Sequence, residues 1–302
     1  MATSRITTLD DPALAPFRAQ KEQWLRARHR PDAETYTTRT GLPPDLPGDL
    51  FIAEGIELLG RLIQSPHEVH AVLVADNRLE AVRPLIGRLH PSVPIHLGTR
   101  EQLGSIVGFD LHRGVLACGR RGRPPTVDEL IESHDTLVML EDLTNHDNVG
   151  SIFRSIRALA GDANPGVLCS PRCCDPLYRK SLRVSMGQAL FVPFATADDW
   201  PATIERVARD RALLALDPGD GSVPIRDAAG RAHEGSPPRR RVAILVGTEG
   251  PGLDERTKKL VRSAGGRLAR IEIDDRADSL NVSTAAAIAL HEIRVARAAG
   301  IR

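Results

Sequence analysis

The chain of 302 residues contains few aromatic side chains, which make up only 3% of it. Proteins that bind single-stranded nucleic acid without sequence preference stack the bases on aromatic residues, so this composition argues against such a stacking platform. Long apolar runs are also missing: no stretch of about 18 apolar residues occurs, and the N-terminus lacks the basic and then apolar layout of a signal peptide. We therefore expect a cytoplasmic protein that has no membrane partner.

Neither sign of charge predominates, because 40 basic residues stand against 39 acidic ones and the net charge is +1. Any nucleic-acid partner would therefore have to bind a local basic surface. Cysteine is scarce as well, and Cys169, Cys173 and Cys174 lack the two spaced pairs that are typical of zinc sites. We expect reduced thiols and no metal site.

The common signatures of nucleotide-dependent and hydrolytic enzymes are missing too. No GxGxxG follows the first strand of either half, and no GxxxxGK[ST] occurs. The chain also has neither a GxSxG nor an HExxH motif. These absences disfavour a dinucleotide-dependent oxidoreductase, an ATPase, a serine hydrolase and a zinc protease.

The first half of the chain shows a helical pattern over residues 8–29 and a Gly- and Pro-rich linker over residues 41–48. Strands and helices then alternate, which predicts an α/β domain with a largely parallel sheet. A basic, proline-rich stretch at residues 120–125 indicates an interdomain linker, so we expect domains at residues 1–122 and 123–302. The expected strands are Leu50–Ala53, Val69–Ala75, Val93–Leu97 and Gly114–Cys118, and the helices are Glu54–Gln64, Arg78–Leu89 and Arg100–Ile106.

The second half repeats the alternation of strands and helices. The segment Asp217–Arg241 is rich in Gly, Pro and Arg and is predicted to be a long loop. The expected strands are Leu137–Leu140, Val167–Cys169, Ala189–Phe194, Ala212–Leu216, Val242–Val246 and Ile271–Asp275. The segment Asn145–Arg154 leads into a helix that ends at about Ala160, and further helices are expected over Leu177–Ser185 and Trp200–Asp210, between the glycine-rich turn and Ile271, and in the last segment up to Ala299.

Polar residues follow three strands of this second half. They are Asn148 and Arg154, then Glu249 within Gly247-Thr-Glu-Gly-Pro-Gly-Leu253, and finally Ser279 and Asn281 before the last helix. Glycines let backbone come close to a ligand, and Ser279 and Asn281 can cap a helix or meet a substrate. One arginine and one glutamate with amide side chains suit the positioning of an oxygen and the stabilisation of charge on it.

These segments resemble the three motifs of the SpoU (TrmH-like) branch of the SPOUT methyltransferases. The motifs stand in order as Asn148-Val-Gly-Ser-Ile-Phe-Arg154, Gly247–Leu253 and Ser279-Leu-Asn-Val-Ser-Thr-Ala285, and the resemblance covers roughly residues 135–302. Residues 50–119 resemble, by pattern, a ribosomal-protein-like substrate-binding domain. The family pattern Ile-Pro-Met-x-Gly is replaced here by Ile271-Glu-Ile-Asp-Asp275.

The resemblance implies an S-adenosylmethionine-dependent enzyme that methylates a ribose 2′-hydroxyl in rRNA or tRNA. It also implies an α/β trefoil-knot catalytic domain, preceded by a smaller α/β substrate-binding domain, and a homodimer. A SPOUT base methyltransferase and a catalytically impaired, RNA-binding knotted dimer remain alternatives. The implied catalytic residues are Arg154, Asn148, Glu249, Ser279 and Asn281, and the implied cofactor-binding residues are Leu245, Val246, Gly247, Gly252, Ile271, Ile273, Leu280 and Ser283.

Overall fold

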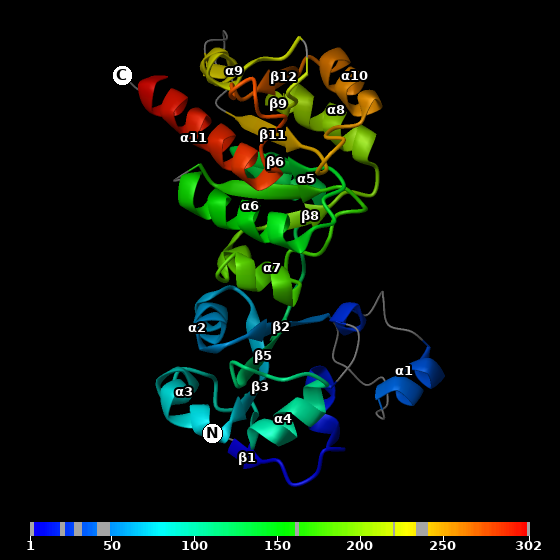
Figure 1. Ribbon diagram of the computed structural model, residues 1–302, viewed down its shortest axis with the longest axis vertical. Helices are drawn as coiled ribbons and strands as arrows, with labels where there is room; N and C mark the ends of the chain where they lie inside the picture. Colours follow the sequence, from blue (N-terminus) through cyan, green and yellow to red (C-terminus); the bar gives the residue numbers. More distant parts are fainter. Residues whose placement is uncertain are drawn as a thin grey trace. The chain divides into compact units, whose positions relative to one another are not determined.

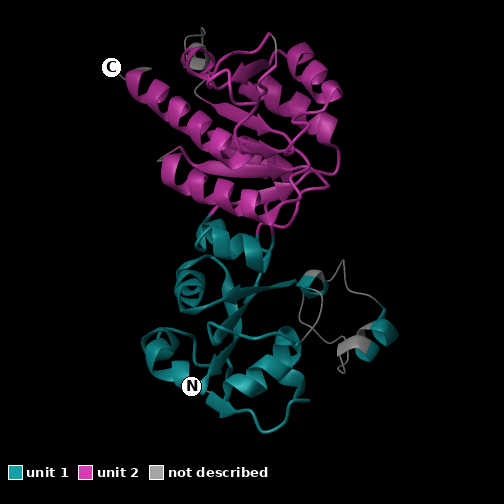
Figure 2. Ribbon diagram, in the orientation of Figure 1, with its two compact units in different colours: residues 1–123, 177–191 teal, residues 124–176, 192–302 magenta. Residues whose placement is uncertain are grey.

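A computed structural model describes residues 3–18, 22–26, 32–40, 49–160, 163–219, 221–233 and 241–300. The predicted linker at residues 41–48 lies outside the described residues. The chain forms two compact units, shown in teal and magenta in Figure 2. Unit 1 comprises residues 1–123 and 177–191, and unit 2 comprises residues 124–176 and 192–302. No helix in the described part of the chain is both long and apolar enough to cross a membrane.

Unit 1 is built on a five-stranded mixed sheet with the strand order β1-β4-β3-β5-β2. Strand β5 runs antiparallel to both of its neighbours, whereas β1, β3 and β4 are parallel to one another. The expectation of a largely parallel sheet was therefore wrong for this unit. The connection after β4 brings the chain back into the sheet at the edge where β4 ends, so that β5 runs in the opposite direction. The strands are β1 (Thr3–Arg5), β2 (Leu50–Glu54), β3 (Glu68–Ala75), β4 (Ile95–Gly98) and β5 (Val115–Arg120).

In the described part of residues 8–29, where one helix was predicted, the chain forms two short 3₁₀ segments, η1 (Pro12–Phe17) and η2 (Glu22–Leu25). Pro16 lies inside η1, where it cannot donate the backbone hydrogen bond that an α-helix needs. Buried apolar side chains of both segments still join the core of unit 1. The other helices of the unit are α1 (Ala33–Thr40), α2 (Ile56–Gln64), η4 (Asp76–Arg78), α3 (Leu79–Ile86), α4 (Arg100–Val107), α7 (Arg179–Val184) and η5 (Gln188–Phe191).

Residues 177–191 pack with unit 1, although the predicted division at residue 122 assigned them to the second domain. Helix α7 contacts β2, and Arg179 and Arg183 each lie 4.0 Å from a carboxylate oxygen of Glu54. Leu182 on this helix is fully buried. Removing the first 123 residues would therefore expose an apolar face. The strand expected over Ala189–Phe194 was wrong, since η5 and the short β8 (Phe194–Thr196) occupy this stretch.

Unit 2 is built on a seven-stranded parallel sheet with the order β10-β12-β9-β11-β6-β7-β8. Its central strands β6, β9 and β11 are short, mostly buried apolar runs, as expected for a parallel sheet that is covered on both faces. The strands are β6 (Thr136–Leu140), β7 (Pro165–Cys169), β8, β9 (Ala212–Leu216), β10 (Val223–Pro224), β11 (Val242–Val246) and β12 (Arg267–Arg270).

Helices α6, α9 and α11 pack together on one face of this sheet, and α5, α8 and α10 pack on the other (Figure 1). Helix α9 lies inside the segment Asp217–Arg241, so the prediction of a long loop there was wrong in part. The helix is stabilised there because the apolar side chains of Ile225, Ala228 and Ala229 are buried. The helices are α5 (Val127–Ser133), α6 (His146–Leu159), α8 (Trp200–Asp210), α9 (Ile225–His233), α10 (Glu255–Ser263) and α11 (Val282–Gly300).

Four partly or fully buried histidines make the stability of the fold dependent on pH. Burial lowers the pKa of His67, His70, His96 and His134, which favours the neutral form of these rings in the folded protein. An unfolded histidine binds a proton near about pH 6.5. The stabilisation is therefore complete above that pH and is lost as the pH falls through the lower folded values. We expect the unfolding temperature to fall between about pH 7 and about pH 5.

A substitution at His96 tests this assignment. The ring is buried, and its Nε2 atom has no hydrogen-bond partner in the described part of the chain. His96→Leu should therefore show a smaller fall in unfolding temperature over this pH range than the parent. His90→Gln, at an exposed histidine, should behave like the parent. Equal pH dependence of the parent and His96→Leu would contradict the role given to His96.

Candidate active site

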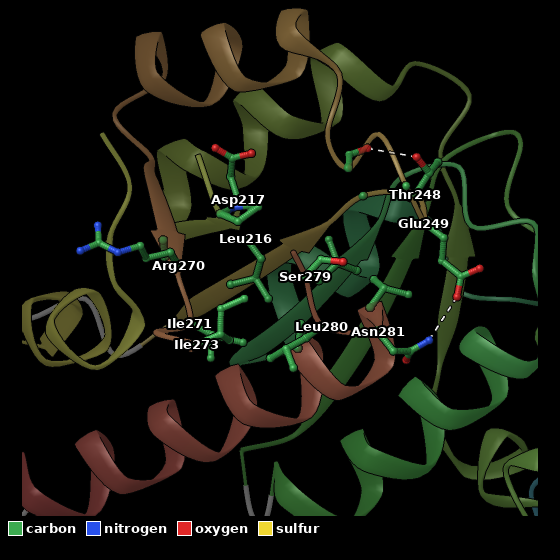
Figure 3. Close-up of a pocket in the computed structure, with 18 residues that line it drawn as sticks. Leu216, Asp217, Thr248, Glu249, Arg270, Ile271, Ile273, Ser279, Leu280 and Asn281 are labelled. Carbon is green, nitrogen blue, oxygen red and sulfur yellow. Dashed lines mark hydrogen bonds between the residues drawn. The ribbon is translucent and has the colours of Figure 1, made fainter. Parts of the chain in front are cut away.

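A cavity of about 250 Å³ lies at the carboxyl ends of β9, β11 and β12, beside the start of α11 (Figure 3). Ligands of open parallel sheets bind at this edge, because the loops that follow the strands converge there. The apolar part of the lining comes from β9, β11, β12 and the residues after them. The lining residues are Leu216, Asp217, Pro218, Val246, Gly247, Thr248, Glu249, Gly250, Gly252, Ala269, Arg270, Ile271, Ile273, Ser279, Leu280, Asn281, Val282 and Ala285.

The glycine-rich segment after β11 closes into a tight hairpin on one side of the cavity. The backbone N–H groups of Thr248 and Gly252 each donate to the other residue's carbonyl oxygen at 3.2 Å, and Thr248 Oγ1 donates to Gly252 O at 3.1 Å. A Cβ atom on Gly247 would lie 2.5 Å from backbone atoms of Gly252 and Leu253. Gly247 is therefore required by the chain's own turn, before any approach to a ligand is considered.

Asn148, Glu249 and Asn281 meet beside the cavity, although they come from three separate motifs. Asn148 Nδ2 donates to Glu249 Oε1. Asn281 Nδ2 donates to the same oxygen at 3.1 Å (Figure 3). Asn281 Nδ2 also lies 3.0 Å from Asn148 Oδ1. The three side chains fix one another, because each is bonded to the other two.

Asn281 also caps helix α11, as its place before the helix predicted. Its Oδ1 accepts the backbone N–H of Ser283 at 2.9 Å and the Ser283 hydroxyl at 2.6 Å. Ser283 does not line the cavity, so its connection to the site runs through Asn281. The side chain that caps α11 is thus the one that contacts Glu249.

The segment after β12 contributes apolar side chains to the cavity. The strand expected over Ile271–Asp275 was wrong: β12 ends at Arg270, and Ile271 and Ile273 turn into the cavity instead of pairing in the sheet. Glu272 and Asp275 are exposed and do not line the cavity. The two acidic replacements in the family pattern therefore lie outside the cavity lining.

Ser279 and Leu280 line the cavity, but besides Ser283 three other predicted residues do not: Asn148, Leu245 and Arg154. Leu245 is fully buried inside β11, so it supports the cavity from the core. Arg154 is exposed on α6 and is not part of the lining. Arg154 comes six residues after Asn148, and an α-helix turns by about 100° per residue. The two side chains therefore point in directions that differ by roughly 120° around the helix axis. Arg154 therefore faces a different side of α6 from Asn148.

Asp217 is a lining residue that the sequence reasoning missed. Its side chain is nearly buried, and it lies 2.8 Å from Lys258 Nζ on α10. The hydrogen bond to Asp217 raises the pKa of Lys258, which keeps the ammonium charged. Asp217 directly follows the predicted strand Ala212–Leu216, so the rule that sites form at carboxyl strand ends could have found it.

Comparison with known proteins identifies the family. The sequence model of the SpoU rRNA Methylase family matches residues 135–291, more than half of the chain and all three motifs. The chain belongs to the SpoU family of RNA methyltransferases. The family membership that the three motifs indicated is thereby confirmed.

Individual relatives agree with the SpoU assignment. An uncharacterized tRNA/rRNA methyltransferase of Mycobacterium bovis is 38% identical over 253 residues, which cover 82% of this chain and 83% of the relative. The 23S rRNA (guanosine-2′-O-)-methyltransferase RlmB of Bordetella pertussis is 27% identical over 249 residues, covering 78% of this chain and 92% of the relative. An AdoMet-bound rRNA methyltransferase from Sinorhizobium meliloti superposes with a TM-score of 0.68 at 25% identity, covering 97% of this chain and 98% of the other.

Proposed function

We propose that this protein transfers a methyl group from S-adenosylmethionine to a ribose 2′-hydroxyl in rRNA or tRNA. The observation that carries the proposal is the convergence of Asn148, Glu249 and Asn281 beside a cavity at the carboxyl edge of a parallel sheet. The similarity to the Bordetella pertussis enzyme, whose name specifies a guanosine 2′-O position, favours a ribose rather than a base as the acceptor.

The cavity fits the nucleoside part of this cofactor. Apolar walls from Leu216, Ile271 and Leu280 suit an adenine ring, and the peptide groups at the strand ends can bond its polar edge. The volume of about 250 Å³ is near the lower end for ligand sites, and the polar side chains of Glu249 and Asn281 line the same cavity beside its apolar walls. When bound, the cofactor supplies the methyl group as a sulfonium. We assign its binding to Val246, Gly247, Gly252, Ile271, Ile273 and Leu280, with Leu245 and Ser283 as supports.

The side chains around the cavity would align the acceptor ribose. Methyl transfer requires the attacking oxygen to lie in line with the methyl group, and the mutually bonded Asn148, Glu249 and Asn281 form a rigid surface against which a ribose can be held. Ser279 adds a hydroxyl at the cavity wall. Arg154 would donate hydrogen bonds to the oxyanion that develops on the ribose, since a guanidinium with a pKa above about 12 is unsuited to act as a base.

We infer that Arg154 takes this role in the cavity of a second copy of the chain. It faces a different side of α6 from Asn148 and is exposed. We infer that residues 135–302 form a trefoil knot and that two copies form a homodimer in which Arg154 of one copy reaches the cavity of the other. A symmetric dimer would then complete both sites in the same way.

Unit 1 is proposed to bind the RNA backbone. Arg78 and Arg113 lie at the edge of its sheet where β3 ends and β5 begins, and both side chains are exposed. Their stems pack over Gly114 and Gly55, which hold positive φ angles of 66° and 104°. Both arginines thus lie exposed at one edge of the sheet, where their guanidinium groups can bind phosphate.

Arg78→Gln together with Arg113→Gln should weaken RNA binding and leave cofactor affinity unchanged. Each lost phosphate contact reduces the magnitude of the slope of log K against log salt by about 0.7–0.9. The slope of the double variant should therefore be smaller in magnitude than that of the parent by roughly 1.5. A filter-binding series over salt concentration measures the slope. An unchanged slope would remove these two arginines from the RNA-binding surface.

Analysis of nucleosides tests the proposed reaction. The protein would be incubated with labelled S-adenosylmethionine and total RNA from cells that lack the gene, and the RNA would then be digested and separated by mass spectrometry. A labelled 2′-O-methylnucleoside is expected, and Asn148→Ala should reduce it strongly. A labelled base would indicate base methylation instead. RNA binding without any transfer would show that the protein is a binder only.

A further inference from the structure

Glu141, which follows β6, is a buried carboxylate with an ordered set of hydrogen-bond donors. It is only 5% exposed. Its Oε2 accepts Trp200 Nε1 and Thr257 Oγ1, each at 2.7 Å, and its Oε1 accepts the backbone N–H of Asp254 at 3.2 Å. Burying a carboxylate is costly in free energy unless hydrogen-bond donors of this kind compensate. The arrangement therefore indicates that Glu141 has a defined structural role.

The contacts of Glu141 hold both ends of the glycine-rich loop at residues 247–253. At the start of the loop, the backbone N–H of Glu141 donates to Val246 O at 2.9 Å. At its end, the carboxylate binds Asp254, which caps α10, and Thr257 in the first turn of that helix. A carboxylate at a helix N-terminus is also favoured by the helix dipole. One residue therefore fixes where the loop leaves β11 and where it enters α10.

We propose that Glu141 is a positioning residue that holds the loop at residues 247–253 in the shape that binds the cofactor. The inference rests on the proposed function, because this loop supplies one wall of the cavity. Glu141 itself does not line the cavity, so its effect passes through the loop. Trp200 and Thr257 donate to the same carboxylate oxygen of Glu141. The fluorescence of the Trp200 indole should therefore change when α10 moves.

Glu141→Gln is the decisive variant, because it keeps the shape and removes one of the two accepting oxygens. The affinity for S-adenosylmethionine, measured by calorimetry well below the unfolding temperature, should fall about tenfold or more, since hydrogen bonds to a buried charge are strong. The rate at saturating cofactor should change far less than KM for the cofactor. Thr257→Val, which removes one donor and keeps the carboxylate, should weaken binding in the same direction by a smaller factor.

Ser170→Ala is the matched control. Ser170 is buried beside Asp142, and its hydroxyl donates to Asp142 Oδ1 at 2.7 Å and accepts the backbone N–H of Asp142 at 2.8 Å. In the described part of the chain, the hydrogen bonds of its hydroxyl do not involve the loop. It should lower the unfolding temperature and leave cofactor affinity within about twofold. In the parent, cofactor titration should change the Trp200 emission, over a background from Trp24, the other of the chain's two tryptophans. This change should be lost in Glu141→Gln.

Three results would overturn the inference. Cofactor affinity of Glu141→Gln within about twofold of the parent would show that the loop does not depend on this carboxylate, and an equal loss in Ser170→Ala would show a general effect of stability. If Glu141→Gln does not fold, unchanged affinity of Thr257→Val would overturn it as well. Failure of the parent itself to bind S-adenosylmethionine would instead refute the proposed function, and this inference would fall with it.

Discussion

Replacing Arg154 by alanine is expected to lower the rate of methyl transfer by roughly 10²–10³-fold while leaving cofactor affinity nearly unchanged, because one preorganised donor to a developing oxyanion typically contributes that much. Arg154 is assigned to the acceptor oxygen and not to the cofactor, so its removal should not disturb cofactor binding. Arg154→Lys should rescue little, since an ammonium cannot reproduce the two-pronged donation of a guanidinium. Single-turnover assays at saturating cofactor measure the effect. Transfer at the parent rate would show that Arg154 is not catalytic.

Mixing two inactive variants tests whether Arg154 acts across a dimer. Arg154→Ala keeps its own Glu249, and Glu249→Ala keeps its own Arg154. If Arg154 serves the partner's cavity, each mixed dimer regains one complete site, so random mixing should restore roughly a quarter of the parent activity. If Arg154 serves its own cavity, both sites of the mixed dimer stay defective. No recovery in dimers shown to have exchanged subunits would therefore exclude the proposed arrangement.

Elements with a clear apolar period could be predicted from the sequence, and those held by tertiary contacts could not. The strand Val242–Val246 and the helix Trp200–Asp210 were predicted with their observed bounds, because strong patterns and flanking breakers define them. The segment Ile271–Asp275 alternates like a strand, yet Ile271 and Ile273 face the cavity. A period of two cannot distinguish a sheet partner from a cavity wall.

The division into units shows the same limit. Leu177–Phe191 lies in sequence between strands of the parallel sheet, yet its buried side chains belong to the other unit. Local pattern predicted the helix there, but which core the helix joins depends on contacts with β2, which is far away in sequence. Long-range pairing of this kind leaves no periodic signal in a single chain.

Within the site, the sequence predicted which polar residues come together better than it predicted why each is needed. Asn148, Glu249 and Asn281 converge as their places after strands suggested. Glu141 and Asp217 also follow strands, but they carry no motif and were missed. Their importance becomes visible only when the donors from α8 and α10 are in place.

The structure gives a different reason why glycine is required at position 247, and this reason changes the expected effect of substitutions at that position. From the sequence, the glycines of the loop were expected to make room for the cofactor. In the structure, a Cβ atom at Gly247 would instead meet the backbone of Gly252 and Leu253 at 2.5 Å. Even alanine must therefore displace the hairpin formed by Thr248 and Gly252. Gly250 differs, because it has a φ of +86° and no atom within 4 Å of an added Cβ.

Gly247→Ala and Gly247→Val are thus both expected to abolish measurable cofactor binding, with affinity reduced by roughly 100-fold or more, because an overpacked turn must rearrange and the cavity wall moves with it. Gly250→Ala should cost about 1–2 kcal/mol of backbone strain, so that cofactor affinity stays within about thirtyfold of the parent. Calorimetric titration measures all three variants, with circular dichroism to verify that each is folded. Because the clash at Gly247 is with the protein itself, alanine should be nearly as harmful as valine. Parent-like affinity of Gly247→Ala would mean that the hairpin tolerates a side chain, and the requirement for glycine would then have to come from the cofactor.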